Sequence, residues 1–467
     1  MTATRIEHDM IGDREIPAHV LWGIHTLRAV ENFQITGRTI ADTPDLIVAL
    51  ACIKEAAAEA NASLGRLDEP LRAAISAACR EIREGCWHDQ FIVDPIQGGA
   101  GTSTNMNANE VIANRALEIM GHSRGAYQHL HPNEHINASQ STNDVYPTAL
   151  KLAARVGVYR LMAAMDLLRQ AFVAKAAEFS DVLKIGRTQL QDAVPMTLGQ
   201  EFGTYALMLA EDQARLAEAV DLIREINLGA TAIGTGINTH PRYAALVREK
   251  LSAILGYELI TAPDLVEATQ DCGAFVQLSG VLKRVAVKLS KICNDLRLLS
   301  SGPRAGFGEI NLPTRQAGSS IMPGKVNPVI PEVVNQVAFE VIGNDITITM
   351  AAEGGQLQLN AFEPVIFDSL HRSLSHLAAG CLTLEANCVR GITANRDHLR
   401  GIVEQSVGIA TALNPHIGYR NATEVAVEAH RTGRGVFEIV LERGLMDKVS
   451  LESALRPENL TTPRDWD

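Results

Sequence analysis

The stretch from Gly318 to Pro328 places two hydroxyls, an ammonium group and an amide within eleven residues, Gly-Ser-Ser-Ile-Met-Pro-Gly-Lys-Val-Asn-Pro. Glycine and proline mark a loop, and these side chains suit a site that holds a small anion and moves a proton. The stretch differs from a P-loop, because Lys325 is followed by Val326 and the hydroxyl that would bind Mg²⁺ is missing. We therefore predict a mobile catalytic loop within a helical scaffold.

Three other polar stretches are candidates for the same site. Gly98–Thr104 departs from the dinucleotide pattern GxGxxG, which leaves a plain helix-entry turn or a loop in which backbone N–H groups and Thr102 face a carboxylate. Ser139–Asp144 precedes a long apolar-periodic segment and suits either a helix N-cap or an anion site, two roles that are compatible. Gly186–Asp192 is predicted to be a polar loop between two long helices.

The histidines of His131-Pro-Asn-Glu-His135 raise the question of a metal site. Pro132 interrupts the helical spacing that would present both rings on one face, and no acidic third ligand is suitably placed. A surface loop is the better prediction for this stretch, as part of a loop over 121–140.

The elements that must position these motifs are mainly helices. Apolar periodicity predicts five long helices, over 144–178, 197–227, 264–299, 331–350 and 363–389. At 1.5 Å per residue, roughly 35 residues give about 50 Å, so several such helices in succession form a long bundle. Shorter helices are predicted over 44–65 and 70–85, and an irregular arm over 1–40.

The predicted fold class is mainly α, with three domains. They are an N-terminal mixed and helical domain over 1–141, a central long-helix bundle over 142–395, and a small helical domain over 396–467. The last domain is predicted to hold segments over 396–413, 421–431 and 436–454.

The helix lengths carry a prediction about assembly. Thr142 opens the predicted helix near 144–178 and Thr188 follows its far end, so the two lie roughly 50 Å apart in one chain. If both line one active site, that site is shared between subunits of a symmetric oligomer.

Composition excludes several functional classes. A net charge of -12 argues against nucleic-acid binding, because no basic stripe supplies phosphate contacts. No uncharged run reaches the roughly 18 residues of a membrane span, and the N-terminus shows no apolar signal-peptide core. The seven cysteines form no CxxC pair, which is typical of the reducing cytoplasm. We expect a cytoplasmic protein with no membrane or nucleic-acid partner.

These motifs together resemble those of the aspartase/fumarase superfamily, with Gly318–Pro328 similar to its signature. The similarity extends over nearly the whole chain, through 98–109, 131–148, 186–202, 229–238, 300–311 and 414–419. Within the superfamily the chain is most similar to the aspartases, because of Thr26–Phe33, Thr102-Ser-Thr, Thr142 and Gln189. Fumarases and some aspartases have a histidine where this chain has Gln189, whereas other aspartases resemble this chain in having Gln. That histidine would pair with the acid matching Glu332.

The resemblance implies a homotetramer with a core of about twenty helices and active sites built from three subunits. It implies conversion of L-aspartate to fumarate and ammonia through an aci-carboxylate, with no required metal or organic cofactor, although some relatives respond to Mg²⁺. It assigns the catalytic roles to the base Ser319 and to Lys325, with Glu332 only as an accessory. The substrate-binding residues it implies are Thr102, Ser141, Thr142, Asn143, Thr188, Gln189, Ser320 and Asn327.

Two alternatives stay open at this point. A fumarate hydratase, or another carbon–nitrogen lyase that forms fumarate, would use the same loop. It is disfavoured by Gln189 and by Thr26–Phe33. A non-catalytic helical scaffold would explain the bundle and would leave the four polar stretches unexplained.

Overall fold

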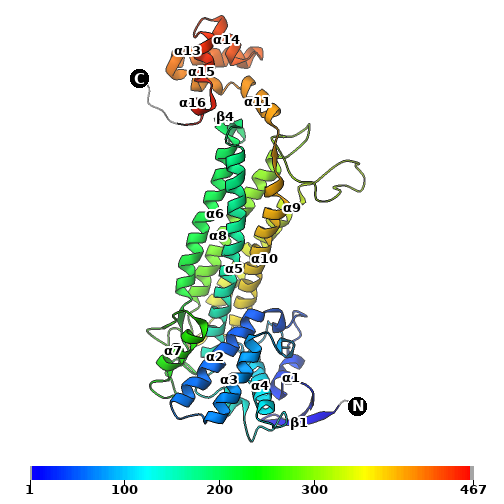
Figure 1. Ribbon diagram of the computed structural model, residues 1–467, viewed down its shortest axis with the longest axis vertical. Coiled ribbons are helices and arrows are strands. Elements are labelled where there is room, and N and C mark those ends of the chain that lie inside the picture. The colour runs from blue at the N-terminus through cyan, green and yellow to red at the C-terminus, as the bar shows by residue number, and fades with distance from the viewer. Residues whose placement is uncertain (1–2, 463–467) are drawn as a thin grey trace. The chain divides into compact units, whose positions relative to one another are not determined.

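The structure, a computed structural model, describes residues 3–462 and is mainly helical, as predicted (Figure 1). The five long helices lie close to their predicted ranges. They are α5 (Thr142–Glu178), α6 (Leu198–Leu222), α8 (Gly273–Leu299), α9 (Val329–Glu353) and α10 (Glu363–Asn387). Only α8 differs by more than a few residues at its start, because 264–272 forms turns.

The chain forms two compact units. Unit 1 comprises Met1–Met162, Ala214–Arg284 and Phe339–His376, and unit 2 comprises Ala163–Gln213, Val285–Ala338 and Leu377–Asp467. Each of the five long helices contributes residues to both units. The division into domains over 1–141, 142–395 and 396–467 stays a prediction.

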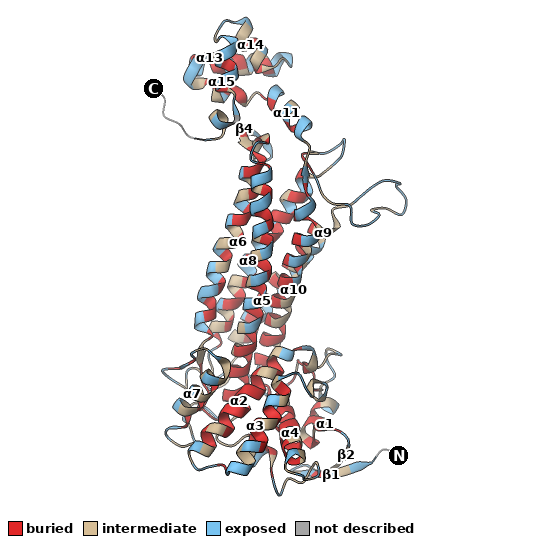
Figure 2. Ribbon diagram, in the orientation of Figure 1, coloured by how far each residue is buried: buried red, intermediate tan, exposed pale blue. Residues whose placement is uncertain are grey.

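Unit 1 has its core among three helices near the N-terminus, which contact one another: α2 (Pro44–Ser63), α3 (Glu69–Arg83) and α4 (Thr102–Ile119). Pro44 stands in the first turn of α2, where proline is tolerated. Most residues of α2 and α4 are buried on all sides (Figure 2), which is typical of helices inside a core rather than on its surface.

The prediction of an irregular arm over 1–40 is wrong. The arm contains an antiparallel hairpin, β1 (Thr4–Asp9) with β2 (Gly12–Pro17), followed by α1 (Ile24–Asn32). Tertiary contacts fix it: the Nε of Arg28 on α1 donates to Asp9 Oδ2 at 2.7 Å. The remaining helix of unit 1 is α7 (Tyr243–Leu255), and β5 (Glu225–Ile226) pairs with β6 (Ile260–Thr261).

Unit 2 contains a hairpin where a polar loop was predicted. Strands β3 (Leu183–Thr188) and β4 (Gln191–Thr197) pair in antiparallel fashion, with Thr188 opposite Gln191. Only Gln189 and Leu190 form the turn, with φ of 54° and 62°. A second small sheet joins β7 (Ile310–Asn311) to β8 (Thr393–Ala394).

The C-terminal part of unit 2 consists of short helices around their own apolar core. They are α11 (Arg396–Gln405), α12 (Ile409–Ala412), α13 (Asn414–Thr432), α14 (Val436–Glu442), α15 (Lys448–Ala454) and α16 (Pro457–Leu460). The segments predicted over 396–413 and 436–454 are therefore each divided into two helices.

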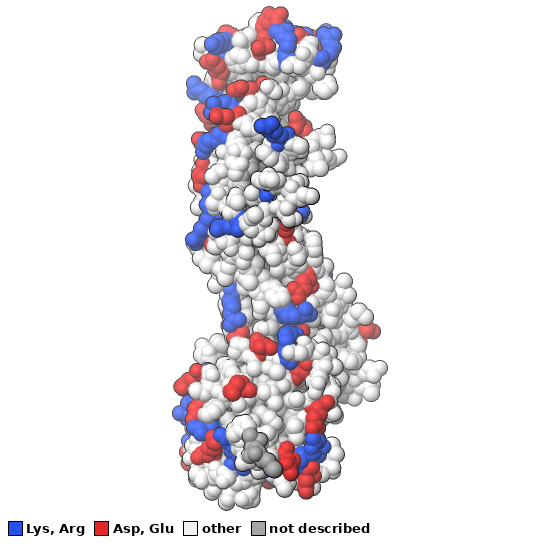
Figure 3. Space-filling model, turned by 90° about the vertical axis from the view of Figure 1, so that its right-hand side faces the viewer, with Lys and Arg blue, Asp and Glu red and all other residues white. Residues whose placement is uncertain are grey.

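Two surface properties bear on function. Over residues 3–462, no helix is both long enough and apolar enough to cross a bilayer. On the face drawn in Figure 3, acidic and basic side chains are interspersed and form no continuous basic stripe.

Candidate active site

Thr102 lies at the first residue of α4 in unit 1. The helix is entered through Gly101, whose φ is 90° and where a Cβ would lie 2.3 Å from the ring of Tyr146, so only glycine fits. The Thr102 hydroxyl donates to the carbonyl of Gly99 at 2.7 Å. An exposed hydroxyl beside a helix N-terminus is suited to an anion such as a carboxylate.

Ser141, Thr142 and Asn143 form the N-terminus of α5, also in unit 1. The Ser141 hydroxyl accepts from the N–H of Asn143 at 3.2 Å, and Asp144 Oδ1 accepts from the N–H of Ser141 at 3.0 Å. This arrangement resembles a capping box. The cap role predicted for this stretch is therefore real, and the same helix end still offers its positive dipole to an anion.

A hydrogen bond connects these two helix ends within unit 1. The amide of Asn105, one turn along α4, donates to the Thr142 hydroxyl at 3.2 Å. Ser141 and Thr142 line a pocket of about 350 Å³ together with Thr231 and Asn238. The structure thus brings the predicted residues on α4 and α5 into one region.

A buried polar network lies beneath that region. Lys54, fully buried, donates to Asn137 Oδ1 at 3.0 Å and to Gln140 Oε1 at 2.9 Å. Burial lowers the pKa of Lys54 to about 7. Burial also raises the pKa of Asp144 to about 6, although three backbone N–H groups donate to its carboxylate and oppose that rise.

Several residues of this region were given no individual role from the sequence. Asp144 Oδ2 accepts from the N–H groups of Gly229 and Thr231 at 3.0 and 2.9 Å, which fastens that loop to α5. Ser139, Thr231 and Asn238 line the same pocket with positive φ of 61°, 56° and 64°. Positive φ in residues other than glycine marks strain that often accompanies a functional site. Such strain leaves no signal in the sequence.

The predicted catalytic loop lies in unit 2, where the segment before α9 projects from the helices (Figure 1). The hydroxyl oxygen of Ser319 accepts from the N–H of Met322 at 2.8 Å and from the N–H of Ile321 at 3.2 Å. Two donors aimed at one oxygen stabilise negative charge on it. The two donors would stabilise negative charge on this oxygen if its proton were removed.

The base of this loop is closed by Asn327. Its amide nitrogen donates to the carbonyl of Gly318 at 2.6 Å, and the N–H of Gly318 donates to the carbonyl of Lys325 at 2.9 Å. Ser320 and Lys325 are exposed. Lys325 and Asn327 also line a pocket of about 850 Å³ in unit 2.

The other predicted residues of unit 2 lie on two elements. Thr188 and Gln189 are exposed at the turn of the β3–β4 hairpin. Glu332 is half-buried in the first turn of α9. The predicted site residues thus fall into one group in each unit.

The histidine stretch forms a short π-helix, Pro132–Ile136, within the predicted loop. The ring nitrogen Nδ1 of His131 accepts from two backbone N–H groups, and Nδ1 of His135 accepts from the N–H of His131. Across the described part of the chain, no three His, Cys, Asp or Glu side chains are grouped to hold a metal ion.

Comparison with known sequences gives matches over nearly the full length. Residues 12–343 match the lyase family and residues 409–462 match the fumarase C C-terminus. A Pseudomonas fluorescens protein named aspartate ammonia-lyase is 61% identical, over 98% of this chain and 96% of its own. An aspartate ammonia-lyase of Escherichia coli K12 is 54% identical over the same shares.

Solved structures agree with the sequence matches. A Brucella melitensis fumarate lyase:delta crystallin, bound to cobalt, is 55% identical with a TM-score of 0.96, over 99% of this chain and 100% of that one. A class II fumarase of Schistosoma mansoni is 34% identical with a TM-score of 0.93, over the same shares. The chain therefore belongs to the lyase family, within the aspartase/fumarase superfamily that its loop motifs resemble.

Proposed function

We propose that this enzyme is an aspartate ammonia-lyase, which converts L-aspartate reversibly to fumarate and ammonia. The observation that carries the proposal is the 61% identity, over 98% of the chain, to a relative of that name. The residue roles below are those that the family resemblance implies, with the contacts that support them.

Ser319 is the proposed base. The proton to be removed lies on Cβ, beside a carboxylate that is already negative, so its loss creates a doubly charged aci-carboxylate. A free serine is a weak base. The two backbone N–H groups that donate to Ser319 Oγ favour its alkoxide and so supply part of the required activation.

Lys325 and Asn327 are the proposed ligands of the β-carboxylate. The ammonium of Lys325 offsets the charge that develops when the Cβ–H electron pair enters the carboxylate. Collapse of this intermediate forms the double bond and expels the amine. A substrate ammonium leaves as neutral ammonia, so the atoms and charges balance without a further acid.

The remaining donors bind the rest of the substrate. In this proposal Thr102, Ser141, Thr142 and Asn143 hold the α-carboxylate and the amino group, with the two helix N-termini adding positive potential. Thr188, Gln189 and Ser320 complete the donor set, and Glu332 is an accessory. No step uses a cofactor.

We further propose a homotetramer whose sites are shared between subunits. Thr142 begins α5, a helix of 37 residues, or about 55 Å. The ten Cα–Cα steps from Glu178, at its end, to Thr188 span at most about 35 Å, so one chain does not bring both residues to one small substrate. Large apolar side chains exposed along α9, Phe339, Ile346 and Met350, support burial against other subunits.

A cytoplasmic location is part of the proposal. Among the described residues the seven cysteines are all free thiols, and six of them are buried. Such usage fits a reducing compartment.

The test is turnover by the purified full chain. With L-aspartate we expect fumarate absorbance to rise and ammonia to appear in equal amount. L-malate is the comparison, because the fumarase neighbour makes hydration the rival function. Fumarate formed from malate and not from aspartate would replace this proposal with the hydratase.

A further inference from the structure

The turn that carries Gln189 has an unfavourable backbone. A two-residue hairpin turn with positive φ at both positions is normally built from Asn-Gly or a similar pair. Here the residues are Gln189 and Leu190, with φ of 54° and 62°. Neither is glycine, so the surrounding structure must hold the turn in this shape.

A group of buried charges lies directly beside that turn. Arg187, one residue before Thr188, donates from Nη1 to Glu309 Oε1, and its guanidinium carbon lies 4.3 Å from the ring centre of Phe307. Lys184 Nζ lies 2.7 Å from the other oxygen of Glu309. The side chains of Lys184 and Glu309 are 2% and 1% exposed.

Glu201 supplies a second carboxylate to this group of buried charges. Lys184 Nζ donates to Glu201 Oε2 at 2.5 Å, so two cations face two carboxylates. Paired buried charges are sensitive to geometry, and a fully connected network holds its members in one arrangement. Because Arg187 is on β3 itself, its anchor on Glu309 fixes the strand immediately before the turn.

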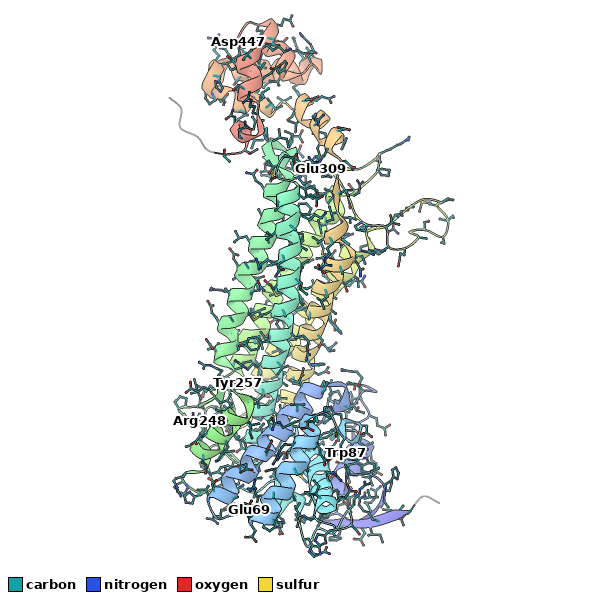
Figure 4. The ribbon with its side chains drawn as sticks, in the orientation of Figure 1. Glu69, Trp87, Arg248, Tyr257, Glu309 and Asp447 are labelled. Carbon is teal, nitrogen blue, oxygen red and sulfur yellow. The ribbon has the colours of Figure 1, made fainter. Side chains whose placement is uncertain are left out.

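Glu309 also lies next to the pocket that Lys325 and Asn327 line, through its two chain neighbours. Its backbone N–H donates to the carbonyl of Leu299 at 2.9 Å, and its carbonyl accepts from the N–H of Asn395 at 2.9 Å. Its neighbours Gly308 and Ile310 line the pocket that Lys325 and Asn327 also line. Glu309 is labelled in Figure 4.

We propose that Arg187, through Glu309 and Lys184, is a positioning residue for Gln189 and Thr188. It does not touch the substrate in this proposal; it holds the strained turn in the shape that presents their side chains. The inference rests on the proposed function, in which those two side chains bind the substrate.

The first experiment is a double-mutant cycle on kcat/KM with L-aspartate. Arg187→Met is measured in the wild-type background and in the double variant Thr188→Ala/Gln189→Ala. We expect a loss of about 10–30-fold in the first background and less than about 3-fold in the second, because the turn then presents neither substrate-binding side chain. Equal losses in both backgrounds would overturn the proposal. If Arg187→Met does not fold, Arg187→Lys, which keeps the charge and loses the guanidinium plane, takes its place.

The second experiment does not depend on turnover. Backbone hydrogen exchange over 183–197 is expected to be at least about 5-fold faster in Arg187→Met, with exchange over α6 unchanged. Arg396→Met is the matched control, since it removes an exposed arginine that pairs with Asp181 just before β3. Unchanged exchange over 183–197 in Arg187→Met would contradict the proposal that Arg187, through Glu309 and Lys184, holds the turn. A wild-type chain that does not turn over aspartate refutes the proposed function, and the exchange result still decides whether Arg187 holds the turn.

Discussion

The two groups of proposed site residues are held in opposite ways. In unit 1, buried side chains hold the Ser141–Asn143 end of α5. Asp144 accepts from the N–H of Ser141, and Asn105 donates to the Thr142 hydroxyl. Their exposures are 0% for Asp144 and 1% for Asn105. In unit 2, most of Gly318–Pro328 is exposed, and the side-chain hydrogen bonds of Ser319 and Asn327 join positions within the loop itself.

The difference suggests a division of labour. A region held by buried side chains presents donors in fixed positions, which is what binding a carboxylate requires. A loop held mainly by its own hydrogen bonds opens and closes at low cost and is suited to a step that must exclude water. Recognition of the α-carboxylate and amino group would then depend on the rigid group in unit 1, and binding of the β-carboxylate and proton transfer on the loop in unit 2.

Replacing the proposed base should give the largest effect. Ser319→Ala removes the only oxygen to which Ile321 and Met322 donate in this turn, and we expect kcat to fall about 10²–10⁴-fold with a small change in KM. Steady-state kinetics with L-aspartate checks this. Turnover like that of the wild type would assign the proton transfer to another group.

Removing the ammonium group of Lys325 from the loop should give the second-largest effect. Lys325→Ala should lower kcat/KM about 10²-fold and affect both KM and kcat, because a charged contact to the β-carboxylate is lost in the bound and transition states. Lys448→Ala, an exposed lysine on α15, is the control. A KM equal to that of the wild type would argue against a carboxylate contact.

Replacing Asp144, which holds the Ser141–Asn143 end of α5, should weaken substrate binding. Asp144→Asn puts an NH₂ group where a carboxylate oxygen accepts backbone N–H groups, so the Ser141–Asn143 end should lose its fixed position. We expect KM to rise about 10-fold with kcat much less affected. Asp166→Asn, on the exposed side of the same helix, should leave KM unchanged. A fall in kcat alone would remove the distinction between the two groups.

The last prediction concerns stability against pH in the core of unit 1, with no direct effect on the site. Burial raises the pKa of Glu363 from its ordinary 4.5 to about 8. Since the folded state then binds the proton more tightly, this residue stabilises the fold below about pH 4.5 and loses that contribution as pH rises to 8. The Tm of Glu363→Gln relative to wild type should therefore increase between pH 5 and 8 and stay level above. Glu258→Gln, on the surface of unit 1, should show no such trend.

The long helices could be predicted because their signal is local and repeated. The predicted range 144–178 differs from α5 by two residues at its start. The β3–β4 hairpin could not be predicted from the sequence, because its strands are short and its turn is Gln-Leu rather than a glycine-containing pair. The hairpin and helix of the N-terminal arm depend on contacts such as Arg28 with Asp9, which lie far apart in sequence.

The candidate site likewise contains some residues that could be proposed from the sequence and others that could not. Ser319, Lys325 and Thr102 stand in motifs that resemble a family, so they could be proposed from the sequence. Asp144 and Thr231 could not be given a role, because the N–H of Thr231 meets Asp144 only in the fold. From the sequence alone, the carboxylate of Asp144 beside Ser139–Asn143 is interpreted as one more candidate N-cap.

The way Ser319 is held also determines which substitutions the loop accepts. Ile321 and Met322 contribute their backbone N–H groups, while their side chains are 83% and 49% exposed. Polar or smaller residues at both positions would leave those donors in place. Proline, which has no N–H, would remove one at either position, although it is present without harm at Pro323, the very next residue. Among single substitutions at these two positions, proline is therefore the one expected to remove a donor from Ser319.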